Sequence, residues 1–294
     1  MIKHINKLMF LFAILVLASC IKDSEEFVPI NGERSVTGDI FGIVTDTIGQ
    51  PVEGALVFFG SRTKTTNQLG VYQFKNVKID VKHNFLNIEK AGYFKATKTF
   101  RSVKEKSEIL LKTLLMAKDF DRSINSEEGG IVEKGRTTLT FPAGSIVDEA
   151  TGELYSGEVK VALQFLYPND ALIDQMMPGD LTAVDKDGIY SVLTSFGMNY
   201  VELQSESGAK LQIKEGKSVT MTSNVPLALL DDAPSEIKMW SFDTNTGLWK
   251  EEGVGQLSDG AYTGEVTHFS CWNYDSSLRS IIVNGRVVDQ DGNP

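Results

Sequence analysis

The 294-residue sequence predicts an all-β protein built from two consecutive β-sandwiches. Its 26 glycines are spread along the chain, as in proteins whose short strands are joined by many tight turns. Turn signals recur about every 8–12 residues in the first half, which is typical of antiparallel sandwiches. No stretch of that half shows sustained helical periodicity. A hydrophobic content of 41% is enough for a buried core.

The first domain is expected over residues 39–117. Asp46 to Pro51 and Thr65 to Gly70 have turn composition, with glycine placed where a turn needs it. Tyr72 and Phe74 are two residues apart, so both face the core if this segment is a strand. The expected strands are residues 40–46, 52–59, 71–74, 85–90, 95–100 and 108–114.

A longer pattern runs through this domain. It reads Gly42-x-Val44-x-Asp46-x-x-Gly49-x-Pro51-Val52-x-Gly54-Ala55-x-Val57, then Thr65-Thr66-x-x-x-Gly70-x-Tyr72-x-Phe74, then Ala91-Gly92-Tyr93. It resembles the carboxypeptidase regulatory-like family, which implies a transthyretin-like (prealbumin-like) sandwich that is a non-catalytic appendage. His83 is the only histidine of the domain, whereas a zinc peptidase site needs several ligands at fixed spacing.

Residues 118–130 are predicted to be a linker and residues 131–275 a second, larger β-rich sandwich. Strands are expected at 158–165, 198–203, 210–213, 218–222, 237–242 and 248–251, the last two joined by a hairpin loop over 243–247. Between residues 167 and 187 the composition shifts to that of a long loop. We identify its centre as a candidate binding loop, formed by Met176, Met177, Pro178, Gly179 and Asp180.

The second domain carries a further set of motifs. They are Phe141-Pro142-Ala143-Gly144-Ser145, Tyr155-x-Gly157-x-Val159, Pro178-Gly179-Asp180, Trp240-Ser241-Phe242-Asp243-x-x-x-Gly247-x-Trp249 and Val266-Thr267-His268-Phe269-Ser270-Cys271-Trp272-Asn273. This set resembles the astroprincin and cartilage intermediate layer protein families and, more distantly, ZU-type domains. The resemblance implies an extracellular domain that is not a metabolic enzyme.

The N-terminus predicts export and lipidation. Basic residues precede the apolar run Leu8–Leu17, which is too short to span a bilayer and is typical of a signal peptide. Leu17-Ala18-Ser19-Cys20 resembles the bacterial lipobox, which implies removal of residues 1–19 and acylation of Cys20. Residues 20–38 are then a flexible tether. Its Ile21–Glu26 segment resembles the Bacteroidetes signal for display on the outer face of the outer membrane; the alternative is the periplasmic face.

The C-terminus resembles the first hairpin. Gly285 to Pro294 repeats Gly42 to Pro51 with glycine, valine, aspartate and proline at matching places. Residues 276–294 are therefore interpreted as the start of a second regulatory-like repeat. If Cys20 is lipidated, Cys271 has no cysteine partner within the chain and is expected to be a buried thiol.

The sequence gives little support to catalysis. The net charge of −10 disfavours nucleic-acid binding. Catalytic-triad, phosphate-loop and His-Glu-x-x-His patterns are missing, so we expect no enzyme, cofactor or metal. The aspartate-rich turns that begin at Asp185, Asp243 and Asp289 fit ordinary hairpin turns better than calcium loops. Trp240, Trp249 and Trp272 are interpreted as core residues rather than a sugar-stacking platform.

The leading functional expectation is a surface lipoprotein that presents β-sandwich modules for adhesion or for binding a protein or glycan. A structural spacer in an envelope complex is one alternative. The other is an autoproteolytic module that cuts between Phe269 and Ser270, as some ZU-type domains do. It would use the Ser270 hydroxyl as nucleophile, with His268 as base only if the strand bends there.

Overall fold

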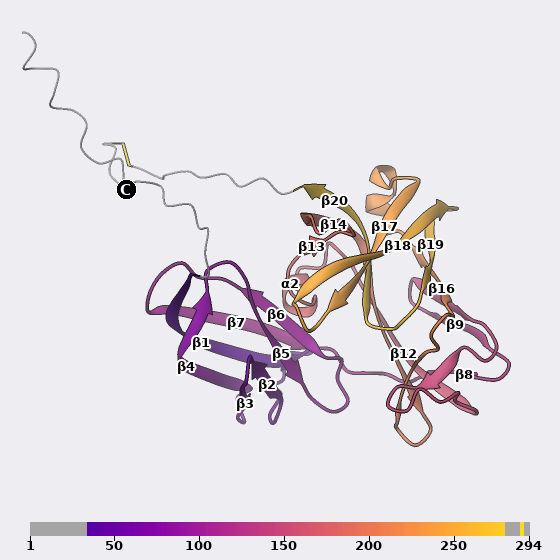
Figure 1. The fold of residues 1–294 in the computed structure, drawn as a ribbon, viewed down its shortest axis with the longest axis horizontal. Coiled ribbons are helices and arrows are strands. Elements are labelled where there is room, and N and C mark those ends of the chain that lie inside the picture. Colours follow the sequence, from indigo (N-terminus) through magenta and orange to yellow (C-terminus); the bar gives the residue numbers. More distant parts are fainter. Residues whose placement is uncertain (1–33, 280–288, 291–294) are drawn as a thin grey trace, which may run out of the picture. The chain divides into compact units, whose positions relative to one another are not determined.

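The computed structural model describes residues 34–279 and 289–290, which are almost entirely β-structure. The all-β prediction is therefore confirmed. The predicted lipidation site Cys20 lies outside the described residues, as does nearly all of the 276–294 segment beyond Arg279. Figure 1 traces two groups of strands in chain order, one in indigo to purple and one in magenta to yellow.

The first sandwich consists of two sheets, with strand orders β4-β1-β7 and β3-β2-β5-β6. β1 and β7 run parallel, with Gly38 opposite Ser107. The two sheets enclose a core that includes Ile40, Tyr72 and Leu86. The strands are β1 (Ser35–Asp46), β2 (Leu56–Phe59), β3 (Arg62–Thr65), β4 (Val71–Asp80), β5 (Asn84–Glu89), β6 (Ala96–Phe100) and β7 (Ser107–Leu115).

Two turns of this sandwich form as their residues predict. The Asp46 side chain accepts hydrogen bonds from the backbone N–H of Ile48 (3.0 Å) and Gln50 (2.8 Å), so the turn is closed by a short-range contact. Gly70 has a φ of +70°, and a Cβ there would overlap with the carbonyl oxygen of Val44. Glycine is thus required at this position both by backbone conformation and by close approach.

Other boundaries differ from the prediction. Residues 52–55 belong to the turn region rather than to a strand, because the backbone of Gly54 and Ala55 pairs with Thr66 across the turns. β3 was not predicted at all. All four of its residues are exposed, so it carries no apolar alternation to detect.

The second β region forms one thirteen-stranded network among the described residues. Its longest strand, β14, pairs with β12, β13, β15 and β20 along different parts of its length, and the pairing with β20 has a register shift between Ser195 and Met198. The elements are β8 (Arg122–Asn125), β9 (Gly130–Lys134), β10 (Thr137–Phe141), β11 (Ile146–Asp148), β12 (Glu158–Leu166), α2 (Ile173–Met176), β13 (Thr182–Val184), β14 (Tyr190–Ser205), β15 (Lys210–Ile213), β16 (Val219–Asn224), the 3-10 helix η1 (Leu227–Asp232), β17 (Glu236–Asp243), β18 (Leu248–Ser258), β19 (Ala261–Val266) and β20 (Cys271–Arg279).

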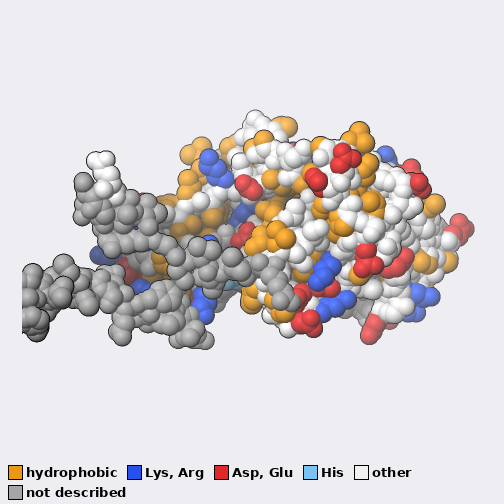
Figure 2. All heavy atoms as spheres, turned by 90° about the horizontal axis from the view of Figure 1, so that it is seen from above, with side chains coloured by type: hydrophobic (Ala, Val, Ile, Leu, Met, Phe, Trp, Pro, Cys, Tyr) orange, Lys and Arg blue, Asp and Glu red, His pale blue; other side chains and the backbone are white. Residues whose placement is uncertain are grey.

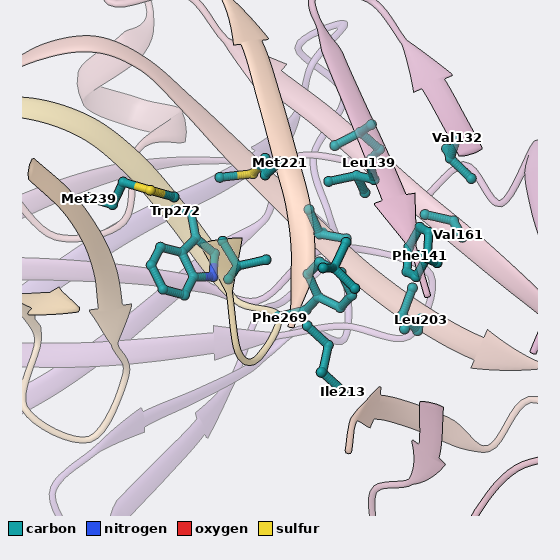
Figure 3. Packing of buried hydrophobic residues seen from close by; sticks show 14 of the residues in the cluster. Val132, Leu139, Phe141, Val161, Leu203, Ile213, Met221, Met239, Phe269 and Trp272 are labelled. Atoms are coloured by element: carbon teal, nitrogen blue, oxygen red, sulfur yellow. The ribbon is translucent and has the colours of Figure 1, made fainter. Parts of the chain in front are cut away.

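The core of this region is continuous across its strands. Figure 3 shows Phe269 and Trp272, from the end of the chain, packed with Leu139, Phe141 and Met221 from earlier strands. The expected alternation in residues 158–165 is confirmed, since Val159, Val161, Leu163 and Phe165 are all buried. None of the helices in the described residues is long and apolar enough to cross a membrane.

Candidate functional site

A cleft of about 250 Å³ is lined by residues of both β regions. The first sandwich contributes Phe94 and Lys95, which follow the Ala91-Gly92-Tyr93 turn. The second region contributes β14, β15 and the segment that enters β20. The apolar lining is Phe94, Pro178, Tyr200, Val201, Leu203, Leu211, Phe242, Phe269 and Cys271, and the polar lining is Lys95, Glu149, Glu202, Lys210, Gln212, Thr244 and Ser270.

The apolar floor of the cleft is rigid and closely packed. The rings of Phe94 and Tyr200 lie 5.3 Å apart across the two regions. Burial raises the pKa of Tyr200 well above its ordinary value, and its hydroxyl lies 3.5 Å from the carbonyl oxygen of Met176. Cys271 is buried beside it as a free thiol, and burial likewise raises the pKa of this thiol. A thiol held protonated in this way is a poor nucleophile.

The rim of the cleft carries both signs of charge. Glu202 is paired with Lys118, and Lys95 is paired with Glu89 at 3.0 Å. Lys210 and Glu149 are exposed, and neither forms an ion pair with another described residue. A ligand that brings its own charged groups would therefore find two rim charges available.

The hairpin turn of residues 243–247 holds the two regions together beside the cleft. Asn87 Nδ2 donates to the carbonyl of Thr244 (2.9 Å), and His83 Nε2 donates to the carbonyl of Thr246 (2.8 Å). Gly247 has a φ of +71°, and a Cβ at this position would lie 2.7 Å from the Cβ of Phe85. This hairpin was predicted, but its role as the contact with the first sandwich was not.

The candidate binding loop is mostly covered. Met177, Pro178 and Gly179 are buried, and only Pro178 lines the cleft. The N–H of Gly179 donates to the carbonyl of Thr97 (2.8 Å) in β6. Asp180 is exposed, and its carbonyl accepts from Trp249 Nε1 (2.8 Å). The predicted loop thus packs against the first sandwich, where its buried backbone groups find their partners.

Lys98 of β6 completes this contact. Its ammonium donates to the carbonyl oxygens of Asp174 (2.6 Å) and Met177 (3.1 Å), next to the loop. Burial lowers the pKa of Lys98 to about 8, and the nearby charge of Asp174 partly opposes this shift. The loop is therefore held by a cation with two carbonyl partners, which also fixes the position of Pro178 at the cleft.

The His268–Ser270 segment forms a bend between β19 and β20, where the sequence suggested a straight strand. His268 Nε2 lies 2.8 Å from Glu252 Oε2, so the ring is engaged away from Ser270. The Ser270 hydroxyl instead donates to the carbonyl of Cys271 (3.3 Å). Gln212 makes hydrogen bonds to both the N–H and the carbonyl of Phe269, which restrains the peptide bond that would be cut.

These contacts predict that the chain stays intact at Phe269–Ser270. The intact mass of purified protein after prolonged incubation is expected to show one species, and Ser270→Ala is expected to give the same result. The reason is that the Ser270 hydroxyl is bonded to the Cys271 carbonyl while Gln212 holds the N–H and carbonyl of Phe269, so the nucleophile and the peptide bond are both restrained. A fragment that begins at Ser270 in the wild type and is missing from Ser270→Ala would contradict this prediction.

The three tryptophans are core residues, as the sequence indicated. Each is at most 1% exposed, and each indole N–H donates to a backbone carbonyl, of Asp275, Asp180 and His268 for Trp240, Trp249 and Trp272 respectively. Aspartates 185 and 243 accept backbone N–H groups of their own turns. Within the described residues no group of three or more His, Cys, Asp or Glu side chains is placed to hold a metal ion.

Comparison with known proteins gives partial matches, and no protein-family model matches the chain. Human cartilage intermediate layer protein 2 is 32% identical over 114 residues, which is 39% of this chain and 10% of that protein. Human cartilage intermediate layer protein 1 is 24% identical over 215 residues, 70% of this chain and 18% of that protein. The chain thus spans between a tenth and a fifth of the length of these relatives. The resemblance to this family is confirmed over part of the chain.

Solved structures give weaker matches. A candidate membrane-associated protein of unknown function from Bacteroides fragilis has 9% identity and a TM-score of 0.24, over 83% of this chain and 99% of that chain. A candidate carbohydrate-binding protein from Bacteroides uniformis has 11% identity and a TM-score of 0.21, over 83% of this chain and 100% of that chain. The carboxypeptidase regulatory-like resemblance of the first sandwich stays an expectation.

Proposed function

We propose that the chain is a lipid-anchored envelope protein that binds a protein ligand in the cleft between its two β regions. The cleft carries this proposal, because it combines a preformed apolar floor with a charged rim and is lined by both regions. Ligand sites in proteins have this character: a mostly apolar concave surface with a few polar groups that orient the ligand.

The chemistry of the cleft favours binding over catalysis. No histidine is among the described residues that line it. Its one hydroxyl nucleophile on the bend, Ser270, donates to a neighbouring carbonyl, and its thiol is buried and protonated. Nucleophilic catalysis would need an activated group within reach of a base.

The shape of the cleft favours an apolar side chain over a sugar ring. The aromatic side chains of the floor are at most 8% exposed, so little of any ring face is open to a ligand. Sugar recognition by stacking needs an exposed face, and the described tryptophans are buried. An apolar side chain of a protein partner would displace water from the floor, while charged neighbours would meet Lys210 and Glu149.

The remaining parts of the proposal concern location. Acylation of Cys20 would hold the protein at the outer membrane through its tether, with the cell surface as the proposed side and the periplasmic face as the alternative. Two acyl chains or more give stable anchoring. A spacer role is the competing function, and the hydrogen bonds of His83, Asn87 and Lys98 across the two regions suit it equally well.

Variants of the cleft rim test the binding proposal. Lys210→Glu and Thr244→Trp are expected to weaken capture of the ligand from native envelope extracts at least tenfold, by reversing a rim charge and by filling the cleft. Lys186→Glu is the matched control, because it makes the same charge change on an exposed turn outside the cleft. Quantitative mass spectrometry of the captured proteins would measure the loss, and circular dichroism would verify folding.

The same variants separate the competing functions. If all three variants captured the ligand as well as the wild type does, the binding site would lie elsewhere on the surface. A glycan-array signal that Thr244→Trp abolishes, without a captured protein, would replace the protein ligand with a sugar. Blank results in both assays for the wild type would favour the spacer.

A further inference from the structure

The two β regions carry opposite net charges. Residues 36–116 hold twelve lysines and arginines against seven aspartates and glutamates, a net charge of +5. Residues 117–279 hold twelve against twenty-six, a net charge of −14. On the face drawn in Figure 2 the acidic side chains are dispersed among uncharged ones and form no single patch. The basic excess belongs to the part of the chain that directly follows the tether.

Two loops of the first sandwich lie at the end where the chain enters it. Residues 101–106 contact the start of β1, where the N–H of Lys106 donates to the carbonyl of Thr37 (2.6 Å) and the N–H of Thr37 donates to Glu105 (2.9 Å). Residues 78–83 reach the same end: the Ile79 side chain lies within 2.9 Å of the position that a Cβ on Gly38 would take. We call these two segments the tether-end loops.

The tether-end loops present unpaired positive charge. Their five basic residues are all exposed, and none forms an ion pair with a described residue. The two acidic residues, Asp80 and Glu105, accept backbone N–H groups. Val103, in the middle of the 101–106 loop, is 61% exposed. The basic residues are Lys78, Lys82, Arg101, Lys104 and Lys106.

We propose that the tether-end loops bind the anionic lipid surface of the membrane that holds the anchor. This inference rests on the anchoring part of the proposed function. The tether keeps the loops close to that surface, since the 15 residues from Cys20 to Ser35 span at most about 50 Å. Basic side chains near an anionic surface strengthen binding about fivefold each, and an exposed valine adds apolar contact.

The charge of the second region sets the orientation. A net charge of −14 is repelled by the same surface within about one Debye length, roughly 10 Å. The 78–83 loop ends at His83, which bonds to Thr246 of the acidic region, so Lys104 and Lys106, beside the start of β1, are the basic residues that would face the lipid. The basic groups thus act as a second membrane signal beside the acyl chains.

Vesicle binding by the unlipidated chain tests this surface. The Cys20→Ser chain without its signal peptide is expected to cosediment with phosphatidylcholine vesicles that contain about 30% phosphatidylglycerol at least tenfold more than with phosphatidylcholine alone. Binding is expected to disappear at about 0.5 M salt, where the Debye length is only a few Å.

Two charge-reversed triple variants give the matched comparison. Replacement of Arg101, Lys104 and Lys106 by glutamate is expected to abolish vesicle binding. The same replacement at Lys186, Lys214 and Lys217, which are exposed on the second region, is expected to leave it unchanged. Thermal unfolding of both variants would verify that they fold.

Three outcomes would overturn the proposal. The first is equal binding of the wild type to both kinds of vesicle, and the second is an equal loss of vesicle binding in the two triple variants. The third is retention of the wild type on dextran sulfate without vesicle binding, which would indicate that the loops bind a soluble anionic polymer. Because the test chain lacks the acylated cysteine, its result is independent of lipidation. An unlipidated wild type would refute the anchor and leave the vesicle result standing.

Discussion

Replacement of Cys20 with serine is expected to remove the protein from the detergent phase of a Triton X-114 partition or to leave residues 1–19 uncut. The cysteine thiol is the acceptor of the lipid in lipobox-containing precursors, and serine does not replace it. Each buried CH₂ of an acyl chain contributes about 0.8 kcal/mol to membrane binding, so loss of several chains changes the partition almost completely. Intact mass would distinguish a free mature chain from an uncut precursor.

Cys271→Ala is the matched control for this experiment. It removes the other cysteine of the chain, which is buried in β20 and is free of disulfide bonding. This variant is expected to stay in the detergent phase with its acyl mass. If Cys20→Ser kept both the detergent partition and the wild-type mass, the lipoprotein proposal would fail. Protease treatment of intact cells that express the wild type would then separate surface display from the periplasmic face.

Replacement of Asp275 with asparagine is expected to stabilise the protein at neutral pH. Asp275 is fully buried in β20, where Oδ2 accepts from Asn273, and hydrogen bonds from Ser195 and the Phe196 backbone only partly oppose the effect of burial on its pKa. Burial raises the pKa of Asp275 well above its ordinary value of 3.8. An ionised carboxylate at this position is costly, whereas asparagine has the same shape and no charge.

The sign of the pH dependence follows from proton binding. Above pH 3.8 the unfolded chain loses the proton of Asp275 while the folded chain keeps it, so stability falls as the pH rises towards the folded pKa. The difference in the free energy of unfolding between Asp275→Asn and the wild type is therefore small near pH 4. It widens as the pH rises from about 4 towards 7, because the unfolded chain loses the Asp275 proton over this range while the raised pKa of the buried carboxyl keeps the proton in the folded chain.

Urea unfolding at about pH 4, 5.5 and 7 would measure this gap. Asp187→Asn, on an exposed turn, is the control and is expected to show no comparable pH dependence. A gap that stayed constant with pH, or that grew as the pH fell, would show that the carboxyl of Asp275 is ionised in the folded protein.

Several strands and the main turns were predictable because their causes are local. In β12, the spacing of Val159, Val161 and Leu163 at every second residue predicts one buried face, although Ala162 on the other face is also buried. Edge segments such as β3 were missed, because an exposed strand has no apolar pattern to distinguish it from a loop. β14 was predicted only over residues 198–203, since the rest of the strand is held by pairing with β13 and β20, which no local pattern indicates.

The candidate site was predicted only in fragments. Pro178 and Ser270 were singled out from their motifs, and both line the cleft. Phe94, Lys210 and Gln212 were missed, because each is an ordinary strand or turn residue in its own segment. The sequence predicted a loop at residues 176–180, but glycine and proline indicate a turn and do not report what packs against it.

The sequence by itself determined the turn at Asp46–Pro51, because a side chain two residues from a backbone N–H closes that turn whatever surrounds it. Its apolar periodicity likewise determined which faces of the strands are buried. Only the tertiary structure decided that Phe94 meets Tyr200 and Phe269 around one cleft. Tyr200 lies 106 positions and Phe269 175 positions after Phe94 in the chain. Their meeting depends on the buried partners that Thr97, Lys98 and Asn87 give to backbone groups of the second region.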